Sequence, residues 1–289
     1  MAPRVSRPRQ LGRDLLVQTG AREPGDIDPI ESAKELGIEV TFGQLKGATA
    51  RISYAKGRAR IRVSDEIETE GRRRTSLGHE LGHYVLKHVL RNEEDPASWF
   101  KASCEHRSRR DERDADVFAV EHLMPEPMVA PYCRVKTVDL HAVRVIERVF
   151  RTSPVMSAMR LVELSPHACA VAYSERGVVK WIKPSRSFPA VVARGKELAR
   201  ESVAFGFFDR GRLFDSPTRL RAGAWVGSSR RSIADLEMIE HAMVIPESGW
   251  GGVLSLLWIP DLASLHTGLG PRATSSLESP QPRTPMANP

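Results

Sequence analysis

The sequence of 289 residues lacks the features of membrane-spanning and secreted proteins. No run approaches the roughly 18 consecutive apolar residues of a membrane-spanning helix. The amino-terminal segment is basic, but it contains no apolar stretch of the kind that a secretory signal needs. Cysteine is scarce: three residues, far apart and odd in number, favour reduced thiols over a disulfide framework. We therefore expect a cytoplasmic protein that does not enter a membrane.

The composition that remains is ordinary for a globular protein. Apolar residues make up 41% and charged residues 27%, and a chain of this length can form one or two domains with a hydrophobic core. The net charge of +7 and the pI near 9.6 come from arginine more than from lysine. Such a balance is compatible with nucleic-acid binding, but the arginines are spread over several clusters, and no single basic face is indicated.

The most informative stretch, Thr75–Leu86, contains the motif H-E-L-G-H at residues 79–83. In a helix, His79 and His83 lie four residues apart on one face, so both imidazoles can reach one zinc ion. Glu80 is poorly placed as a ligand but can contact a water at the metal, as the general base of an H-E-x-x-H metallopeptidase does. The alternative is a helix with two surface histidines and a solvated glutamate.

A second predicted helix, over residues 110–124, offers a third ligand. A carboxylate at Glu112 would complete a His-His-Glu set with an open fourth position, which is the catalytic rather than the structural zinc pattern. Asp116, one turn later, could accept the N–H of a ligating imidazole and so orient that ring. The alternative is a solvated charged face. Cys104, between the two helices, is a less favoured candidate for the third ligand.

These motifs resemble those of the ImmA/IrrE family of bacterial metallopeptidases, a branch of the zincins. The likeness rests on H-E-L-G-H, on E-x-x-A-D-x-F-A from residue 112 to 119 and on the L-M-P that follows, although Asp116 stands where the family usually has asparagine. The resemblance implies that His79, His83 and Glu112 bind Zn²⁺ and that Glu80 is the catalytic base. Mn²⁺ stays open as the working ion, because nitrogen and oxygen ligands accept both metals.

The resemblance also implies a substrate, namely a helix-turn-helix repressor of the XRE type whose cleavage induces a stress or mobile-element response. We expect such a repressor as the protein partner. One alternative is a DNA-binding regulator with a structural or vestigial metal site, and another is a protein-binding, antitoxin-like module. The group that would stabilise the oxyanion is not identified by the sequence. Tyr84, Tyr132 and nearby arginine or histidine residues are candidates.

The predicted fold class is α+β, with a zincin-like metallopeptidase domain at its centre. In that domain a helix ending at Gly37 precedes three strands of a small antiparallel sheet. One unidentified edge of the sheet would hold the substrate as an added strand. The predicted segments are a disordered basic tail (1–24), the zincin-like domain (25–130), a helical, helix-turn-helix-like segment (131–166), a small α+β domain (167–262) and a disordered tail (263–289).

Two later regions leave alternatives open. Helices over 138–150 and 155–163 are joined by a short turn, and the second could read DNA through Ser157 and Arg160. An ordinary packed pair of helices is the favoured interpretation, because the second helix has no asparagine or glutamine. A surface that binds a partner protein is a third option. Further predicted features are a lid (92–110), strands at 168–173, 178–182 and 252–259, and a helix at 190–202.

Overall fold

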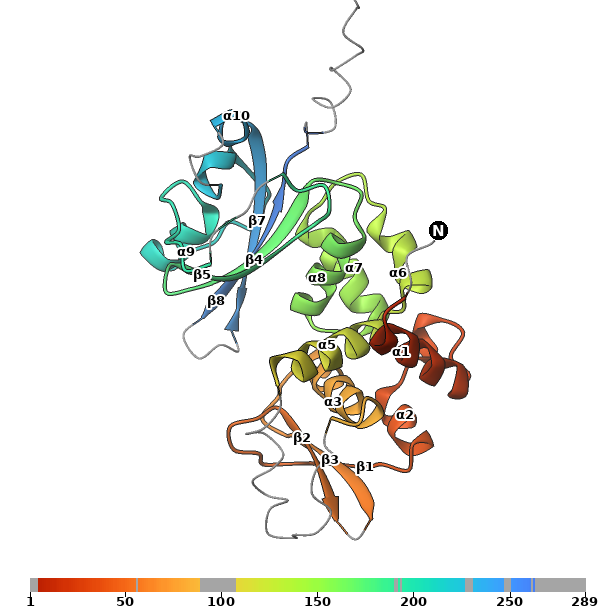
Figure 1. Ribbon diagram of the computed structural model, residues 1–289. Coiled ribbons are helices and arrows are strands. Elements are labelled where there is room, and N and C mark those ends of the chain that lie inside the picture. Colours follow the sequence, from red (N-terminus) through yellow and green to blue (C-terminus); the bar gives the residue numbers. More distant parts are fainter. Residues whose placement is uncertain are drawn as a thin grey trace, which may run out of the picture.

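The computed structural model describes residues 5–55, 57–88, 108–189, 192, 194–226, 231–246, 251–260 and 262. Within them, two sheets and the surrounding helices form a mixed α+β fold, as predicted. The sheets lie at opposite ends of the molecule, with a group of helices between them (Figure 1). None of the described helices is both long and apolar enough to cross a membrane. Cys104, the predicted tail over 263–289 and the predicted lid up to residue 107 lie outside the described residues.

The part of the chain that carries the H-E-L-G-H motif contains a small mixed sheet. Strand β3 (Arg58–Ser64) has β2 (Ala50–Ala55) antiparallel on one side and β1 (Glu39–Gly43) parallel on the other. The prediction of an antiparallel sheet is therefore wrong for β1, because the chain passes from β1 across β3 to the far edge before it forms the β2–β3 hairpin. The helices here are α1 (Arg7–Gln18), η1 (Pro24–Asp26), α2 (Pro29–Glu35), α3 (Glu70–Val85) and α5 (Arg109–Leu123).

The apolar side of α3 packs against this sheet. Strand β3 alternates exposed and buried residues, so Ala59, Ile61 and Val63 point to one face. Leu77 and Leu81 of α3 belong to the same hydrophobic cluster. Their burial fixes which side of α3 faces the sheet, and it leaves the two histidines of the motif on a different side of the helix.

The first helix corrects the prediction of a disordered tail over residues 1–24. Residues 7–18 form α1, whose Leu15 and Leu16 are buried. A Cβ at Gly12 would lie 3.1 Å from the carbonyl oxygen of Phe118, so α1 lies close against α5. Arg9 and Arg13 of α1 pair with Glu121 of α5. Composition alone could not reveal that partner.

The helices between the two sheets confirm the predicted pair and correct its DNA-reading interpretation. Ser153 caps the second helix by accepting a hydrogen bond from the N–H of Met156. Ser157 and Arg160, the predicted readers, are both 0% exposed. The second helix is therefore a core helix, which is the interpretation that the sequence favoured. These helices are α6 (Glu126–Cys133), α7 (Leu140–Phe150) and α8 (Pro154–Leu164).

The carboxy-terminal part is an antiparallel sheet of order β5-β4-β8-β7-β6. Val171 and Leu256 on one face pack in the same core cluster as α7 and α8, whereas Ala172 and Leu257 on the other face pack with α9. The three strands predicted here are confirmed, and β6 and β7 were not predicted. The bounds are β4 (Cys169–Glu175), β5 (Val178–Pro184), α9 (Val203–Arg210), β6 (Thr218–Arg221), η2 (Ala222–Ala224), α10 (Arg231–Ala234), β7 (Glu237–Ile245) and β8 (Gly252–Trp258).

The helix predicted over residues 190–202 is wrong. Residues 194–198 instead lie beside β5, where the N–H of Gly195 donates to the carbonyl of Val179. Gly195 has a φ of +83°, which is incompatible with the interior of a right-handed helix. The helix of this region starts only after Ser202, whose hydroxyl caps α9.

A buried ion cluster joins α8 to α5 and α1. Nη2 of Arg160 lies 2.7 Å from Oε2 of Glu121 on α5, and both side chains are fully buried. Glu121 also pairs with Arg9 and Arg13 of α1, at 3.1 and 2.6 Å. The basic residues of the amino terminus therefore neutralise a carboxylate in the core.

A second carboxylate extends this cluster to the five-stranded sheet. Glu163 of α8 pairs with Arg9, Arg160 and Lys183, the last of which lies on β5 at 3.0 Å. Burial opposes ionisation of Glu163, but the charges of Lys183, Arg160 and Arg9 outweigh it and lower its pKa to about 2. Glu163 therefore stays charged through the neutral and mildly acidic range.

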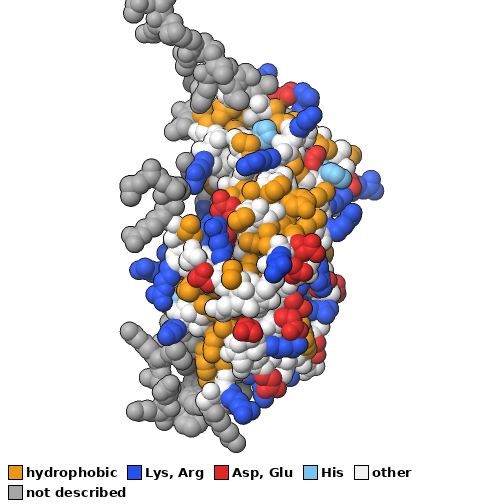
Figure 2. All heavy atoms as spheres, turned by 90° about the vertical axis from the view of Figure 1, so that its right-hand side faces the viewer, with side chains coloured by type: hydrophobic (Ala, Val, Ile, Leu, Met, Phe, Trp, Pro, Cys, Tyr) orange, Lys and Arg blue, Asp and Glu red, His pale blue; other side chains and the backbone are white. Residues whose placement is uncertain are grey.

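Charges on the molecular surface are mixed. On the face shown in Figure 2, basic and acidic side chains are interspersed around a central area of hydrophobic side chains. Among the side chains coloured there, the net charge of +7 does not produce a continuous basic surface. That face therefore lacks the broad basic patch that contacts a nucleic-acid backbone.

Replacing Arg160 with methionine should lower the free energy of unfolding by about 3 kcal/mol, the lower end of the cost of breaking a buried ion pair, because Glu121 loses its fully buried partner but keeps Arg9 and Arg13. Urea denaturation measures the loss. Arg219→Met is the matched control, since Arg219 is 72% exposed and pairs with Glu237 at the surface, and it should lose only about 0–1 kcal/mol. Equal losses in the two variants would contradict the buried cluster.

The depressed pKa of Glu163 predicts an acid-sensitive stability. Because this pKa falls from an ordinary value of 4.5 to about 2 in the folded protein, the stabilisation is complete above about pH 4.5 and is lost as the pH falls towards 2. Glu163→Gln should be less stable at neutral pH and should show a flatter decline in acid. Melting temperatures recorded across this range measure the effect, and parallel profiles for the two proteins would refute it.

Candidate metal centre

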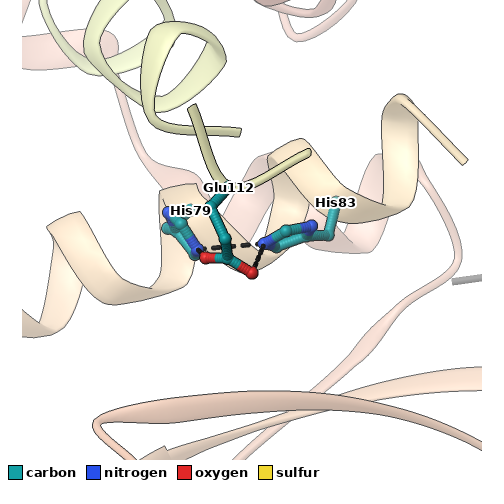
Figure 3. Close-up of side chains that lie close together, drawn as sticks. All are labelled: His79, His83 and Glu112. Carbon is teal, nitrogen blue, oxygen red and sulfur yellow. Dashed lines mark hydrogen bonds and ion pairs between the residues drawn. The ribbon is translucent and has the colours of Figure 1, made fainter. Parts of the chain in front are cut away.

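Two histidines of α3 and one glutamate of α5 point at a common position (Figure 3). The Nε2 atoms of His79 and His83 are 3.0 Å apart. The carboxylate oxygens of Glu112 lie 3.1 Å from Nε2 of His79 and 3.5 Å from Nε2 of His83. The structure thus brings together the three residues that the sequence predicted as metal ligands.

The separations between these atoms fit a bound divalent cation. Bonds of about 2.0–2.1 Å in a tetrahedral set place the ligand atoms about 3.3 Å from one another. The observed separations of 3.0, 3.1 and 3.5 Å lie around that value. Two imidazoles and a carboxylate are donors that zinc and other first-row cations accept. The cluster could therefore hold a metal ion through three protein ligands.

Close packing of α3 on α5 makes the convergence possible. A Cβ at Gly82 would lie 2.9 Å from the carbonyl oxygen of Ala115 and 3.0 Å from its Cα, closer than a side chain tolerates. A Cβ at Gly78 would lie 3.1 Å from the side chain of Leu123. Gly82 therefore sets the distance between the two helices, and that distance decides whether Glu112 reaches the histidines.

The second nitrogen of His79 contacts Asp116, as predicted. Nδ1 of His79 lies 2.8 Å from Oδ1 of Asp116, so an Nδ1–H tautomer donates to the carboxylate and turns the Nε2 lone pair towards the cluster. Burial lowers the pKa of His79, but the hydrogen bond and charge of Asp116, with the charges of Glu80 and Glu112, outweigh it and raise the pKa above its ordinary value.

Glu80 lies beside the cluster and contacts the small sheet. It is buried, and its Oε2 accepts a hydrogen bond of 3.0 Å from the N–H of Ile52 on β2. Strand β2 is one of the two edge strands of this sheet in the described part of the chain. The carboxylate therefore lies between the motif helix and a strand edge, and it is not one of the three converging groups.

One histidine at the site was not predicted. Nδ1 of His88 lies 3.1 Å from Nδ1 of His83, whereas Nε2 of His83 faces Glu112. Helical spacing could not reveal this contact, because His88 lies beyond the end of α3 and residues five apart do not share a helix face. The only signal in the sequence is the presence of a third histidine shortly after the motif.

The tyrosines considered as oxyanion donors make other contacts. Tyr84 stacks on Tyr54 of β2, with ring centroids 6.3 Å apart. Tyr132 packs edge-on against Phe150, with centroids 5.7 Å apart, and belongs to the helical core. Of the two, only Tyr84 contacts the strand that also contacts Glu80.

The site combines a helix that carries H-E-x-x-H, a carboxylate from the next helix and a strand edge beside them. This is the arrangement found in metallopeptidase domains of the zincin type. Residues 33–162 match the family model described as IrrE N-terminal-like domain, Peptidase_M78. This segment is therefore an IrrE-like domain, as the motifs predicted. It contains the whole His-His-Glu cluster, Glu80, helices α3, α5, α6 and α7, and most of α8.

The fold of the chain is similar to that of a solved structure described as a Mycobacterium tuberculosis transcriptional regulator. The TM-score is 0.55, over 95% of this chain and 94% of that chain. At 13% identity the likeness concerns the fold alone. The likeness spans nearly all of both chains, so it includes both sheets and the helices between them. A search of curated proteins found no relative of this sequence.

Replacing Gly82 with alanine should weaken Zn²⁺ binding by at least about tenfold, as the loss of ligand-positioning groups does. The added methyl group would overlap the backbone of Ala115, so α5 must shift and carry Glu112 away from the histidines. Competition against a chelating dye measures the affinity. Gly206→Ala is the control, because a Cβ there would lie 3.8 Å from its nearest neighbour. Wild-type affinity in Gly82→Ala would show that the helix separation does not govern the site.

Proposed function

We propose that this chain is a zinc-dependent endopeptidase that cuts a specific regulatory protein in the cytoplasm. The observation that carries the proposal is the convergence of His79, His83 and Glu112 beside the buried carboxylate of Glu80. Three protein ligands leave a zinc ion with an open position, which is the catalytic pattern. The match of residues 33–162 to Peptidase_M78 supports the same activity.

The roles of the side chains follow from their positions. A cation bound by the three ligands would lower the pKa of a water molecule and polarise the scissile carbonyl. Glu80 acts as the general base that takes the proton of the attacking water, and it then donates that proton to the leaving amine. The amide of Ile52 holds the carboxylate in place through a hydrogen bond. Asp116 keeps His79 in the tautomer that turns Nε2 to the cluster.

We expect the substrate peptide to bind along β2. An edge strand offers backbone N–H and C=O groups that pair with an extended peptide. The hydrogen bond between Ile52 and Glu80 marks the point where this edge meets the catalytic base. Strand addition depends mainly on backbone hydrogen bonds, so the substrate must offer an extended segment to β2. Contacts elsewhere must supply selectivity.

The substrate that we propose is a helix-turn-helix repressor of the XRE type, cleaved to induce a stress or mobile-element response. The resemblance of the motifs to ImmA/IrrE enzymes supports this choice. The fold likeness to a protein described as a transcriptional regulator supports a regulatory setting. A repressor with an exposed linker between folded units would offer the extended segment that a strand edge accepts.

A second function is favoured by the extent of that fold likeness, which covers 95% of the chain. In this function the chain regulates by binding DNA or a protein, in the manner of an antitoxin, and the metal site is structural or vestigial. The burial of Ser157 and Arg160 argues against DNA reading by α8. Protein binding is therefore the stronger form of this alternative.

Glu80→Gln separates the two functions. Glutamine keeps an acceptor for the N–H of Ile52 and leaves the three ligands in place, so folding and Zn²⁺ binding should not change. Cleavage should fall by about 10²–10⁴-fold, which is the usual contribution of a general base. The assay incubates the protein and Zn²⁺ with purified XRE-type repressors from the same genome, beginning with any encoded beside this chain, and identifies products by mass spectrometry.

Two controls complete that assay. A chelator should stop cleavage by the wild type, and Glu31→Gln, at a surface carboxylate that is 59% exposed, should cut at the wild-type rate. Unchanged cleavage by Glu80→Gln would contradict the role of Glu80. A stable complex with the repressor and no cleavage by the wild type would favour the second function.

A further inference from the structure

The turn that ends α3 folds the chain back onto the metal cluster. The N–H of Lys87 donates to the carbonyl of Tyr84, and the N–H of His88 donates to the carbonyl of His83, both at 3.0 Å. Lys87 has a φ of +59°, in the left-handed region. This pattern is a Schellman motif, which reverses the chain at the end of a helix. It places His88 next to His83.

The rings of His83 and His88 meet nitrogen to nitrogen. The Nδ1 atoms are 3.1 Å apart, and the rings lie edge to face at 70°. At this distance one nitrogen donates a proton and the other accepts it. Nε2 of His83 faces His79 and Glu112. If that nitrogen supplies a lone pair to a metal, Nδ1 of His83 carries the proton and Nδ1 of His88 accepts it.

Asp111 favours the matching tautomer of His88. When Nδ1 of His88 accepts, its proton is on Nε2, and Oδ1 of Asp111 lies 3.8 Å from that nitrogen. This separation gives electrostatic attraction rather than a hydrogen bond. Asp111 is held in place by reciprocal hydrogen bonds of 3.1 Å with Ser108 at the start of α5. The first turn of α5 thus carries both Glu112 and the carboxylate that faces His88.

We propose that His88 is the positioning residue for His83 and that Asp111 holds His88 in the required tautomer. The side chain of His83 is fully buried and that of His88 is 10% exposed, so water competes poorly for the contact. The other imidazole, His79, has a carboxylate partner, Asp116, at the surface. The inference rests on the metal centre of the proposed function, and it does not require peptidase activity.

A ligand role for His88 itself fits the geometry less well. Nδ1 of His88 contacts Nδ1 of His83. The position shared by the three predicted ligands lies instead next to Nε2 of His83. To bind the same ion, His88 would have to leave this contact. The two roles also predict different numbers of bound zinc ions. A positioning role predicts one ion per chain, whereas an ion held between Nδ1 of His83 and His88 would be a second one.

The test compares Zn²⁺ affinity in three variants of the full chain. His88→Ala removes the acceptor and should weaken Zn²⁺ binding by about 10–100-fold. His88→Asn places a side-chain oxygen where Nδ1 lies in histidine, so it should restore most of the affinity. His141→Ala removes an exposed histidine of α7 and should bind as the wild type does. Competition with a chelator of known affinity gives the dissociation constants, and metal analysis gives the stoichiometry.

Two further measurements separate positioning from general stability. The melting temperature of the metal-free protein should be similar in His88→Ala and His88→Asn. Histidine-ring ¹H–¹⁵N spectra of the zinc-loaded wild type should show the proton of His83 on Nδ1. Asp111→Asn retains a capping oxygen for Ser108 and should weaken Zn²⁺ binding less than His88→Ala does.

Each other outcome overturns the proposal in a distinct way. Wild-type affinity in His88→Ala would show that His83 needs no such support. Equal weakening in the alanine and asparagine variants, with a lower melting temperature in both, would assign His88 a structural role. Loss of one of two bound zinc ions would make His88 a ligand. Failure of the wild type to bind Zn²⁺ would refute the metal centre itself, and this result is read before any variant is compared.

Discussion

The close contact between α3 and α5 is the constraint on which the metal cluster depends. The motif helix supplies two imidazoles by its own geometry, but a third ligand must come from another element. Glu112 reaches them because Gly82 has no side chain, which allows the backbone of Ala115 to approach. Leu81 and Phe118 are fully buried in one cluster and hold the helices in this contact. The glycine of H-E-L-G-H therefore has a packing role beside the chemical roles of its neighbours.

Charge fixes the other end of α5. Glu121 is the point where α1, α5 and α8 meet, through Arg13 and Arg160. Glu163 continues the cluster to Lys183 of the five-stranded sheet. The helix that carries Glu112 is thus packed by apolar contacts near the cluster and by buried ion pairs two turns further on. This arrangement physically connects the IrrE-like domain to the carboxy-terminal sheet.

The predictions that succeeded depend on local spacing. His79 and His83 share a helix face whatever the rest of the chain does, and the pair of helices around Ser153 follows from a cap and from periodicity. The failures concern partners that are distant in the sequence. Arg160 is buried because Glu121, 39 positions away, neutralises it, and Arg9 meets the same carboxylate across 112 positions. A composition-based prediction treats such arginines as solvated.

Other errors have equally specific causes. The parallel pairing of β1 with β3 depends on which edge the chain crosses to, and alternation of residues does not encode that. A helix was predicted at 190–202, but the backbone of residues 195–198 pairs with the start of β5 and the turn before it. The contact of His88 with His83 was not predicted, because a turn, rather than a helix face, brings the two residues together. Turn geometry and long-range pairing are therefore the information that spacing rules omit.

The most direct test of the metal centre is a crystal of the protein grown with Zn²⁺ and measured on both sides of the zinc absorption edge. We expect one strong anomalous peak bonded to Nε2 of His79, Nε2 of His83 and a carboxylate oxygen of Glu112, at about 2.0–2.2 Å from each. A peak that excludes Glu112, or the absence of any peak between α3 and α5, would contradict it.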